Sequence, residues 1–419
     1  MVSIIQLIKK RKSFIWNSIS GMITAGQSAV ILIFISYNYT IYESGLFTIA
    51  YAIANLVYSL GKYGIRNFQV TDVRNKYRFS EYFVARVLTV FFTVIFVAIL
   101  VLLQYRIGRY TVEKSEIVFW FCVWKLIDAF EDVFWGMYQQ KGRLDFAAKY
   151  YSFRLMISTI LICVLLVYKI DFLYVTRITV ISSIIVSAVV LHFTFIKMKE
   201  TITGVRGTYV KKMLLECFPL CLGTTLAMFV GNMPKYMIDF YQDESSQALF
   251  GYIMLPAFMI MLLNGFIYLP MVREFGELYY QGQKKQFLTK IVKQCLVVVG
   301  LTAFVMLVSY VIGIPILNQL YNVDLSSLKF ELMVLLLGGG LYALVNFLMI
   351  PLTTMREQRY MAVAFAIVAV LGFVIGKYLT VNYNIMGAVI LYILINAVLF
   401  VLFFVAIVIG LLKENCEKR

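Results

Sequence analysis

The hydrophobic and polar positions of this chain alternate on the scale of whole helices. Twelve apolar stretches are separated by short and mostly basic segments. About 20 consecutive apolar residues suffice to cross a bilayer as one helix, so each stretch predicts one membrane span. The predicted spans cover residues 13–36, 44–61, 81–103, 116–138, 150–168, 172–196, 213–234, 246–270, 294–316, 330–350, 360–376 and 385–411.

These spans are predicted to be helices and to lie in lipid. The stretches Val87–Leu103 and Ile385–Leu411 are apolar on every face, whereas strands of a membrane barrel alternate apolar and polar residues. The chain has 419 residues, 62% of them hydrophobic, with a mean hydropathy of +0.84. A soluble protein of this size has too little interior to bury so much apolar surface. The predicted class is an all-α polytopic membrane protein.

The basic residues predict the orientation of the chain. Placing the N-terminus inside puts 27 of the 38 Lys and Arg residues in the inner segments and 7 in the outer loops. Basic loops resist translocation, so both termini are predicted to be cytoplasmic. The net charge of +16 then follows from topology and from attraction to anionic headgroups, and it does not indicate nucleic-acid binding. The inner segments are 1–12, 62–80, 139–149, 197–212, 271–293, 351–359 and 412–419.

The chain divides at the basic inner segment 197–212, with six predicted spans on either side. This division predicts two lobes, residues 1–205 and 206–419. The stretch Glu43–Phe47 before the second span resembles Ser246–Phe250 before the eighth, as expected after an internal duplication. Two pseudo-symmetric six-helix lobes around a central cavity are typical of transporters that work by alternating access.

Several classes of enzyme are excluded by what the sequence lacks. It has no P-loop, and its single histidine, His192, lies near the inner end of the sixth span. The six cysteines are scattered, without the spacing of a metal site or a disulfide framework. We therefore predict that the protein is not an enzyme and that it has no metal site and no cofactor.

The fourth span carries four charged residues at membrane depth: Lys125, Asp128, Glu131 and Asp132. Each such residue costs about 2.5–3.5 kcal/mol at the centre of a helix in lipid. At 100° per residue, Lys125, Asp128 and Asp132 lie within about 60° of one another, and Glu131 lies about 60° further round. This polar stripe must face water or partner charges. A network that only joins helices and a site that contacts substrate both remain open.

Three arginines lie within other predicted spans. Arg154 is predicted at a depth similar to that of Asp132 on the antiparallel neighbour, so the two residues are expected to form an ion pair. Arg86 and Arg177 each lie about five residues from a helix end, and their side chains are expected to reach the interface. Lys235 and Asp239 follow Pro234 and share one face if the helix continues past the proline.

The chain also resembles a known family, the Wzx-type polysaccharide flippases, in the superfamily of the peptidoglycan lipid flippase and the MATE drug exporters. The resemblance runs along most of the chain. It implies translocation of an undecaprenyl-diphosphate-linked oligosaccharide repeat unit across the bacterial cytoplasmic membrane for O-antigen, capsule or other surface polysaccharide, without covalent chemistry. The strings that carry it are Trp16–Gln27, Lys62–Asp72, Gly136–Asp145 and Asn232–Asp239.

The expected substrate suggests roles for the charged residues. A diphosphate carries about two negative charges and an oligosaccharide many hydroxyls, so both need a hydrated, cation-lined path. The cations expected to bind the diphosphate are Lys125, Arg154, Arg66 and Lys235. The acids expected to bind a coupling ion, H⁺ or Na⁺, or to contact sugar hydroxyls are Asp128, Asp132, Glu131 and Asp239.

Other functions remain open at this stage. A MATE-like exporter of cationic drugs would use the acids of the fourth span, and a membrane-embedded glycan polymerase or ligase would need a larger outer loop. A non-transporting scaffold would need the polar stripe only for folding. The expected partners are the lipid-linked oligosaccharide, membrane lipids and other membrane proteins of polysaccharide assembly, but no nucleic acid.

Overall fold

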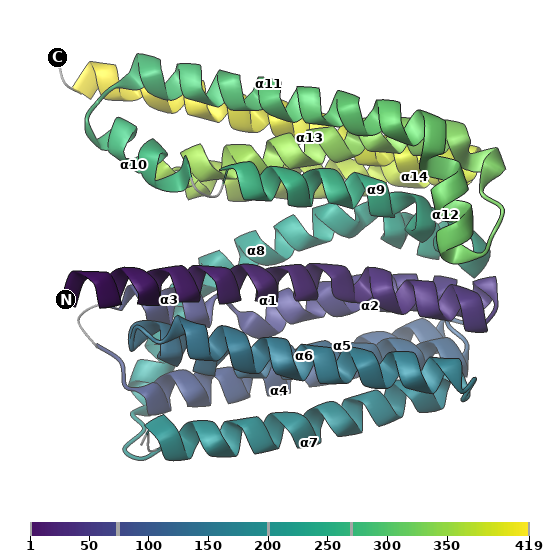
Figure 1. Cartoon of the computed structure of the whole chain (residues 1–419), viewed down its shortest axis with the longest axis horizontal. Coiled ribbons are helices and arrows are strands. Elements are labelled where there is room, and N and C mark those ends of the chain that lie inside the picture. Colours follow the sequence, from purple (N-terminus) through teal and green to yellow (C-terminus); the bar gives the residue numbers. More distant parts are fainter. Residues whose placement is uncertain (1, 73–75, 199–201, 269–270, 418–419) are drawn as a thin grey trace. The chain divides into compact units, whose positions relative to one another are not determined.

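The computed structural model describes residues 2–72, 76–198, 202–268 and 271–417, and these residues are almost entirely helical (Figure 1). No strand occurs among them, which confirms the predicted all-α class. The helices are α1 (Val2–Asn38), α2 (Ile41–Lys62), α3 (Ile65–Thr71), α4 (Phe79–Arg106), α5 (Val112–Gln140), α6 (Leu144–Val167), α7 (Phe172–Met198), α8 (Gly207–Tyr241), α9 (Glu244–Tyr268), α10 (Val272–Tyr280), α11 (Lys284–Val308), η2 (Ser309–Gly313), α12 (Ile314–Tyr321), η3 (Ser326–Leu328), α13 (Lys329–Thr354) and α14 (Gln358–Glu417).

Ten helices in the described residues are long and apolar enough to cross a membrane, so the chain is a multi-pass membrane protein. Two features explain the difference from the twelve predicted spans. The four charges of α5 make it too polar to be counted, although it packs among the spans. The spans predicted at 360–376 and 385–411 both lie in α14, which is broken at Asn384 by a φ of 48° and a ψ of −129°. In the described part of the chain, each predicted span is therefore helical to within one residue, and the span 294–316 runs through α11, η2 and α12. Residues 269 and 270 of the span 246–270 lie outside the described residues.

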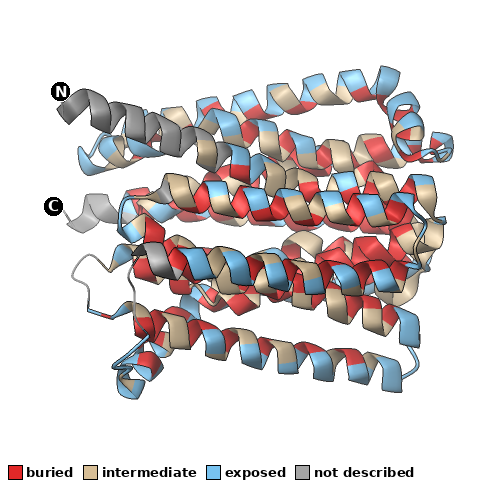
Figure 2. Cartoon of the chain, turned by 60° about the horizontal axis from the view of Figure 1, so that its bottom comes forward, coloured by how far each residue is buried: buried red, intermediate tan, exposed pale blue. Residues whose placement is uncertain are grey.

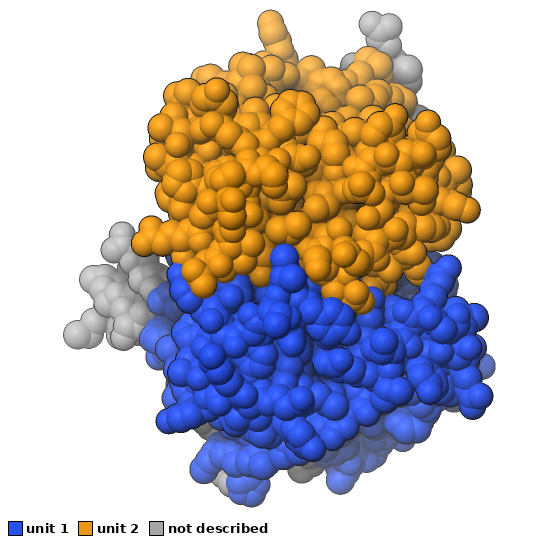
Figure 3. Space-filling view, turned by 90° about the vertical axis from the view of Figure 1, so that its right-hand side faces the viewer, with its two compact units in different colours: residues 1–228 blue, residues 229–419 orange. Residues whose placement is uncertain are grey.

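The structure forms two compact units, residues 1–228 and 229–419 (Figure 3). We call them unit 1 and unit 2. Their boundary lies within α8, later than the loop 197–212 at which the sequence divides into two sets of spans. The reason is local packing, because Met213 and Cys217 of α8 belong to the hydrophobic core of unit 1. The Phe218 ring also lies 6.4 Å from the Tyr63 ring of α2–α3.

Two inner segments that were predicted as loops contain short helices. Segment 62–80 contains α3, and segment 271–293 contains α10. Each of these helices follows the second long helix of its set of spans, because α3 follows α2 and α10 follows α9. The order of elements thus repeats along the chain, as expected for two pseudo-symmetric halves.

One helix forms the centre of each unit. In unit 1, α5 packs against α2, α4, α6 and α7, and in unit 2, α13 packs against α9, α11 and α14. Buried residues follow the inward sides of the helices, and exposed residues follow the outward sides (Figure 2). A central helix that is enclosed by neighbours can carry polar groups that lipid would not tolerate.

Consecutive glycines allow α13 to be packed on three sides. A Cβ atom at Gly338 would lie 2.6 Å from Tyr392 of α14, and one at Gly339 would lie 3.0 Å from the Ala257 backbone of α9. A Cβ atom at Gly340 would lie 2.6 Å from Thr302 of α11. Because α13 continues from Lys329 to Thr354, these glycines serve close packing and do not break the helix.

Candidate functional site

The charged residues of α5 belong to a network inside unit 1. Asp132 lies eight residues before the end of α5, and Lys125 lies fifteen residues before it. At 1.5 Å per residue, these positions are about 12 and 22 Å from the helix end. The network therefore extends from the end of unit 1 at which α5 ends and α3 lies, which we call its basic end, toward the middle of α5.

Asp132 is the centre of the part nearest the helix end. Its carboxylate accepts a hydrogen bond from Arg86 of α4 at 3.1 Å and one from Arg66 of α3 at 3.4 Å. The Nζ atom of Lys62, at the end of α2, lies 3.6 Å from the same carboxylate. Three cations from three elements thus surround one buried acid, and this group has a formal charge of +2.

A second group lies deeper. Asp128 forms ion pairs with Arg154 of α6 and, at 3.2 Å, with Lys125 of its own helix. The Nε atom of Arg154 lies 2.7 Å from a carboxylate oxygen of Glu131. Two cations and two acids alternate here, so this group is neutral.

The excess positive charge therefore belongs to the group around Asp132, and within it to the accessible members. The side chains of Arg66 and Lys62 are 21% and 32% exposed, whereas that of Arg86 is fully buried. Lys125 and Arg154 are also buried. An anion that approached this network would meet Arg66 and Lys62 first.

A break between α2 and α3 brings these cations to Asp132. Tyr63 and Gly64 have φ values of 51° and 69°, a conformation that costs glycine little, and they turn the chain out of α2. The Gly61 carbonyl at the end of α2 accepts hydrogen bonds from Arg86 at 2.8 Å and from Thr89 at 3.1 Å. This carbonyl, which lies in the last turn of α2, thereby finds hydrogen-bond donors within the protein, as a buried helix end requires.

Contacts with α5 hold Arg66 in place. Its guanidinium donates to the Gln139 side chain at 2.9 Å and lies 4.5 Å from the centre of the Trp135 ring. A Cβ atom at Gly136 would overlap the Gln69 side chain, so this glycine provides the space in which α3 meets α5. The strings Lys62–Asp72 and Gly136–Asp145, which carry the family resemblance, thus meet in the structure.

Polar contacts continue the network to α1 and α6. Lys125 donates to the Gln27 side chain at 2.8 Å, and Gln27 donates to Thr159 at 2.9 Å. The Tyr51 ring lies 4.8 Å from the Lys125 ammonium. Gln27 ends the string Trp16–Gln27, so a third string of the resemblance also reaches this network.

A small cavity of about 40 Å³ lies beside Glu131. Its polar lining includes Trp135, Tyr138 and Thr194. The Oε1 atom of Glu131 and the Nε1 atom of Trp135 are buried and have no hydrogen-bond partner within the described ranges. A cavity of this size and polarity has room for water.

Three expectations about the arginines are answered by these contacts. The predicted ion pair between Arg154 and Asp132 is wrong, because Arg154 binds Asp128 and Glu131. Arg86 was expected to reach the interface and does not, because the Gly61 carbonyl and Asp132 hold it inside unit 1. Arg177 is 36% exposed and pairs with Glu116, which agrees with a position near the interface.

The remaining predicted residues lie in unit 2. Helix α8 continues past Pro234 to Tyr241, so Lys235 and Asp239 are four residues apart on one face. Lys235 has no ion-pair partner among the residues that the structure describes. No group of three or more His, Cys, Asp or Glu residues in the searched part of the chain is arranged to hold a metal ion.

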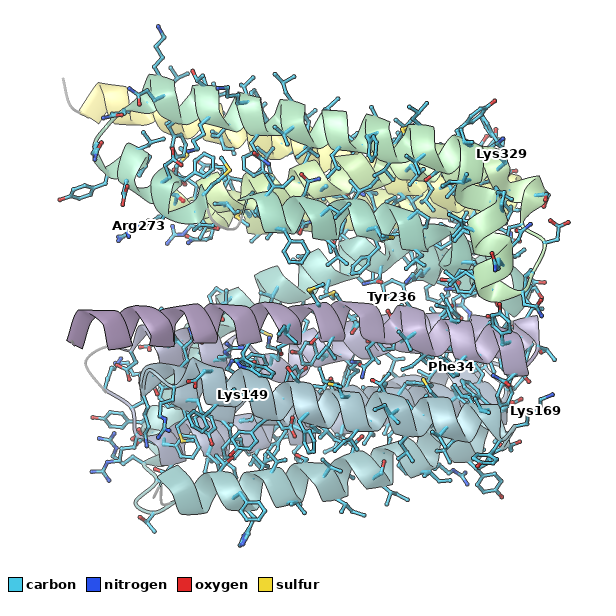
Figure 4. All side chains as sticks on the ribbon, viewed as in Figure 1. Phe34, Lys149, Lys169, Tyr236, Arg273 and Lys329 are labelled. Carbon is cyan, nitrogen blue, oxygen red and sulfur yellow. The ribbon has the colours of Figure 1, made fainter. Side chains whose placement is uncertain are left out.

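The sequence did not place Lys62 or Arg86 in the site. The sequence did indicate that further cations were needed, because the stripe on α5 has one cation and three acids and so requires cations from other helices. In unit 1, two lysines from segments predicted to lie on opposite sides of the membrane are found at opposite ends. Lys149 lies toward the end of unit 1 that holds α3, and Lys169 lies at the opposite end (Figure 4).

Comparison with known proteins places the fold. No family model and no curated protein sequence matches the chain. The lipid II flippase MurJ, in an inward closed conformation, has a TM-score of 0.71 at 13% identity, covering 95% of this chain and 89% of MurJ. A multidrug resistance MATE family transporter in an inward-facing conformation has a TM-score of 0.62 at 16% identity, covering 97% of this chain and 95% of that one.

A third similar structure is a MOP superfamily transporter from Pyrococcus furiosus, described as having a binding pocket of reversed polarity that suggests a different function. Its TM-score is 0.61 at 13% identity, with 98% of this chain and 96% of that chain covered. The chain therefore has a MATE-like transporter fold. At these identities the comparison shows the fold alone, and the choice of substrate rests on the residues of the site.

Proposed function

We propose that this protein is a flippase that moves an undecaprenyl-diphosphate-linked oligosaccharide from the inner to the outer leaflet of the bacterial cytoplasmic membrane. Alternating access of the two units moves the substrate, without any covalent bond being made or broken. The product supplies surface polysaccharide assembly. The observation that carries the proposal is the formal charge of +2 around Asp132, with Arg66 and Lys62 accessible.

The charge of this group suits a diphosphate. A diphosphate in a lipid linkage carries about two negative charges, and planar guanidinium groups bind phosphate oxygens with charge-assisted hydrogen bonds. Arg66 and Lys62 lie near the basic end of unit 1, where a lipid in the inner leaflet presents its headgroup. We assign the first contact with the diphosphate to these two residues. Lys125 and Arg154, which were expected to share this role, are already paired with acids.

The same observation disfavours a MATE-like exporter of cationic drugs. Such a substrate needs a carboxylate that is free to pair with it. Asp128 and Asp132 each bind two or more cations of the protein, and Glu131 binds Arg154. A positively charged drug would have to displace these buried pairs, at a cost of several kcal/mol.

The test is leaflet-resolved measurement of the lipid-linked oligosaccharide in cells that lack this protein. We expect the lipid to accumulate on the cytoplasmic side and to be cleared when the wild-type protein is restored. A failure of this lipid to accumulate, together with a gain in drug resistance on expression, would contradict the flippase and support the exporter.

We further propose that a coupling ion, H⁺ or Na⁺, acts at Glu131. Asp128 and Asp132 each bind two or more cations, whereas Glu131 binds one, Arg154, through its Oε2 atom. The Oε1 atom of Glu131 has no hydrogen-bond partner in the described residues, and the residue lines the small cavity. A carboxylate oxygen without a hydrogen-bond partner, beside a cavity with room for water, is a place where an ion can bind and leave.

Replacing Glu131 with Gln is expected to make transport insensitive to the ion gradient while the substrate still binds. Transport into vesicles is measured with and without an imposed H⁺ or Na⁺ gradient. Glu113→Gln, at an exposed acid in the first turn of the same helix, provides the control. Unchanged gradient dependence in the Glu131 variant would rule out this residue as the coupling group.

A further inference from the structure

A groove on unit 1 lies apart from the charge network. It is formed by α4, the first turns of α8 and the loop that precedes α8, and its volume is about 340 Å³. Val84 and Leu88 of α4 line one side, and Val210 and Leu214 of α8 line the other. The rest of the lining consists of Tyr63, Val205, Gly207, Lys211 and Leu215. Apart from Lys211, this lining is almost entirely apolar.

The groove lies at the depth of lipid chains and headgroups. Val84 and Leu88 follow the start of α4 at Phe79 by five and nine residues, or about 8 and 14 Å along the helix. Leu215, beside the groove, is 67% exposed on a helix that is apolar enough to cross the membrane. The groove therefore opens toward the bilayer at the basic end of unit 1.

The rim of the groove is positively charged. Lys211 lines the groove and has no hydrogen-bond or ion-pair partner in the described part of the chain. Arg206 is paired with Glu81 at 2.5 Å, and Arg78 donates to the Gly204 carbonyl at 3.5 Å. Two carboxylates accompany these cations: Glu81, and Glu216, which pairs with Lys76 and faces Lys212. The five cations Lys76, Arg78, Arg206, Lys211 and Lys212 exceed the two acids by three charges.

We propose that this groove binds an anionic phospholipid of the inner leaflet, with one acyl chain between α4 and α8 and the phosphate on Lys211. The apolar walls match the chain, and the charged rim matches a phosphodiester. This lipid is distinct from the transported molecule, because Lys211 lies on α8, whereas the cations assigned to the diphosphate contact Asp132 of α5.

The bound lipid contacts the break between α2 and α3. Tyr63 lines the groove, while its neighbour Lys62 reaches toward Asp132. Gly64 packs directly against α8, since a Cβ atom there would lie 2.9 Å from Leu220. A lipid that fills the groove therefore stabilises the segment that carries Lys62 and Arg66.

The test measures lipid binding to the full-length protein in neutral detergent by native mass spectrometry, with phosphatidylglycerol compared with phosphatidylcholine. We expect phosphatidylglycerol to bind about fivefold more tightly, because one lysine contributes about 1 kcal/mol to the attraction of an anionic lipid. Lys211→Gln should remove that preference. Lys212→Gln removes the same charge from a residue outside the lining. This variant should keep most of the preference for phosphatidylglycerol.

A second variant tests the groove itself. A Cβ atom at Gly207, which lines the groove, would meet nothing within 4 Å, so the backbone there accepts a side chain and Gly207→Leu is designed to fill the groove. This variant should lose binding of phosphatidylglycerol while its unfolding temperature without lipid stays that of the wild type.

Two results would overturn the proposal. If both phospholipids bind equally and Lys211→Gln does not change their binding, the groove holds only the nonspecific lipid that surrounds any membrane protein. If undecaprenyl diphosphate displaces phosphatidylglycerol from the groove, the groove binds the tail of the transported lipid instead. Neither result depends on the transport assay, so this proposal and the proposed function fail separately.

Discussion

Asp132→Asn is expected to destabilise the protein by about 3–5 kcal/mol, because it leaves a buried charge without its partner. Arg86 is fully buried and depends on this carboxylate for charge compensation. The amide would also leave Arg86, Arg66 and Lys62 close together with no acid between them. Since about 1 kcal/mol shifts the unfolding midpoint of a unit of this size by about 2–4 °C, the midpoint should fall by roughly 6–20 °C.

Thermal unfolding of the purified protein in detergent measures this effect. Asp145→Asn serves as the control, because it removes an acid from the half-buried first turn of α6. Combining Asp132→Asn with Arg86→Met should recover part of the lost stability, since the methionine removes the unpaired charge and keeps most of the volume. If Asp132→Asn unfolds at the wild-type temperature, the buried cluster does not hold unit 1 together.

Arg66→Glu is expected to reduce transport of the lipid-linked oligosaccharide by about 30-fold or more. Loss of one partner from a desolvated charge pair costs about 2–5 kcal/mol, and reversal adds repulsion between the new carboxylate and the diphosphate. The fold should persist, because Lys62 and Arg86 then face two acids, the introduced one and Asp132, and their charges balance. The expected defect is therefore in transport rather than in folding.

Leaflet-resolved accumulation of the lipid, measured beside the unfolding midpoint, separates these two effects. Lys285→Glu reverses an exposed lysine near the start of α11 and should transport normally. Lys62→Gln should have a smaller effect than Arg66→Glu, because Lys62 is more exposed and makes no hydrogen bond with Asp132. Normal transport by a folded Arg66→Glu protein would show that the anion does not pass these cations.

Most of the fold was predictable from the sequence because the bilayer constrains membrane helices so strongly. An apolar stretch of sufficient length has few alternatives to a helix, and the described residues of the twelve predicted spans are helical to within one residue. The short helices α3 and α10 were missed, since both lie in basic inner segments without a long apolar stretch. The break at Asn384 was implied by the separation of two spans, but its tightness depends on Gly387, where a Cβ atom would collide with the Leu379 carbonyl.

The candidate site was predictable in part. The stripe on α5 follows from helical periodicity, which places Lys125, Asp128 and Asp132 on one side of the helix. The partners of these residues do not follow from it. Arg154 was assigned to Asp132 from its depth, but the rotation of α6 about its axis directs it to Asp128 and Glu131.

The sequence by itself determined the helical class, the stretches that form the long helices and the presence of buried charges that required compensation, because these depend on hydropathy and helical periodicity. Only the tertiary structure decided which cation meets which acid. A turn at Tyr63 and Gly64 redirects Arg66 into the bundle, and the space left by Gly136 admits α3 beside α5. The excess positive charge therefore collects around Asp132, because pairing depends on helix rotation and on the direction of one break, neither of which hydropathy encodes.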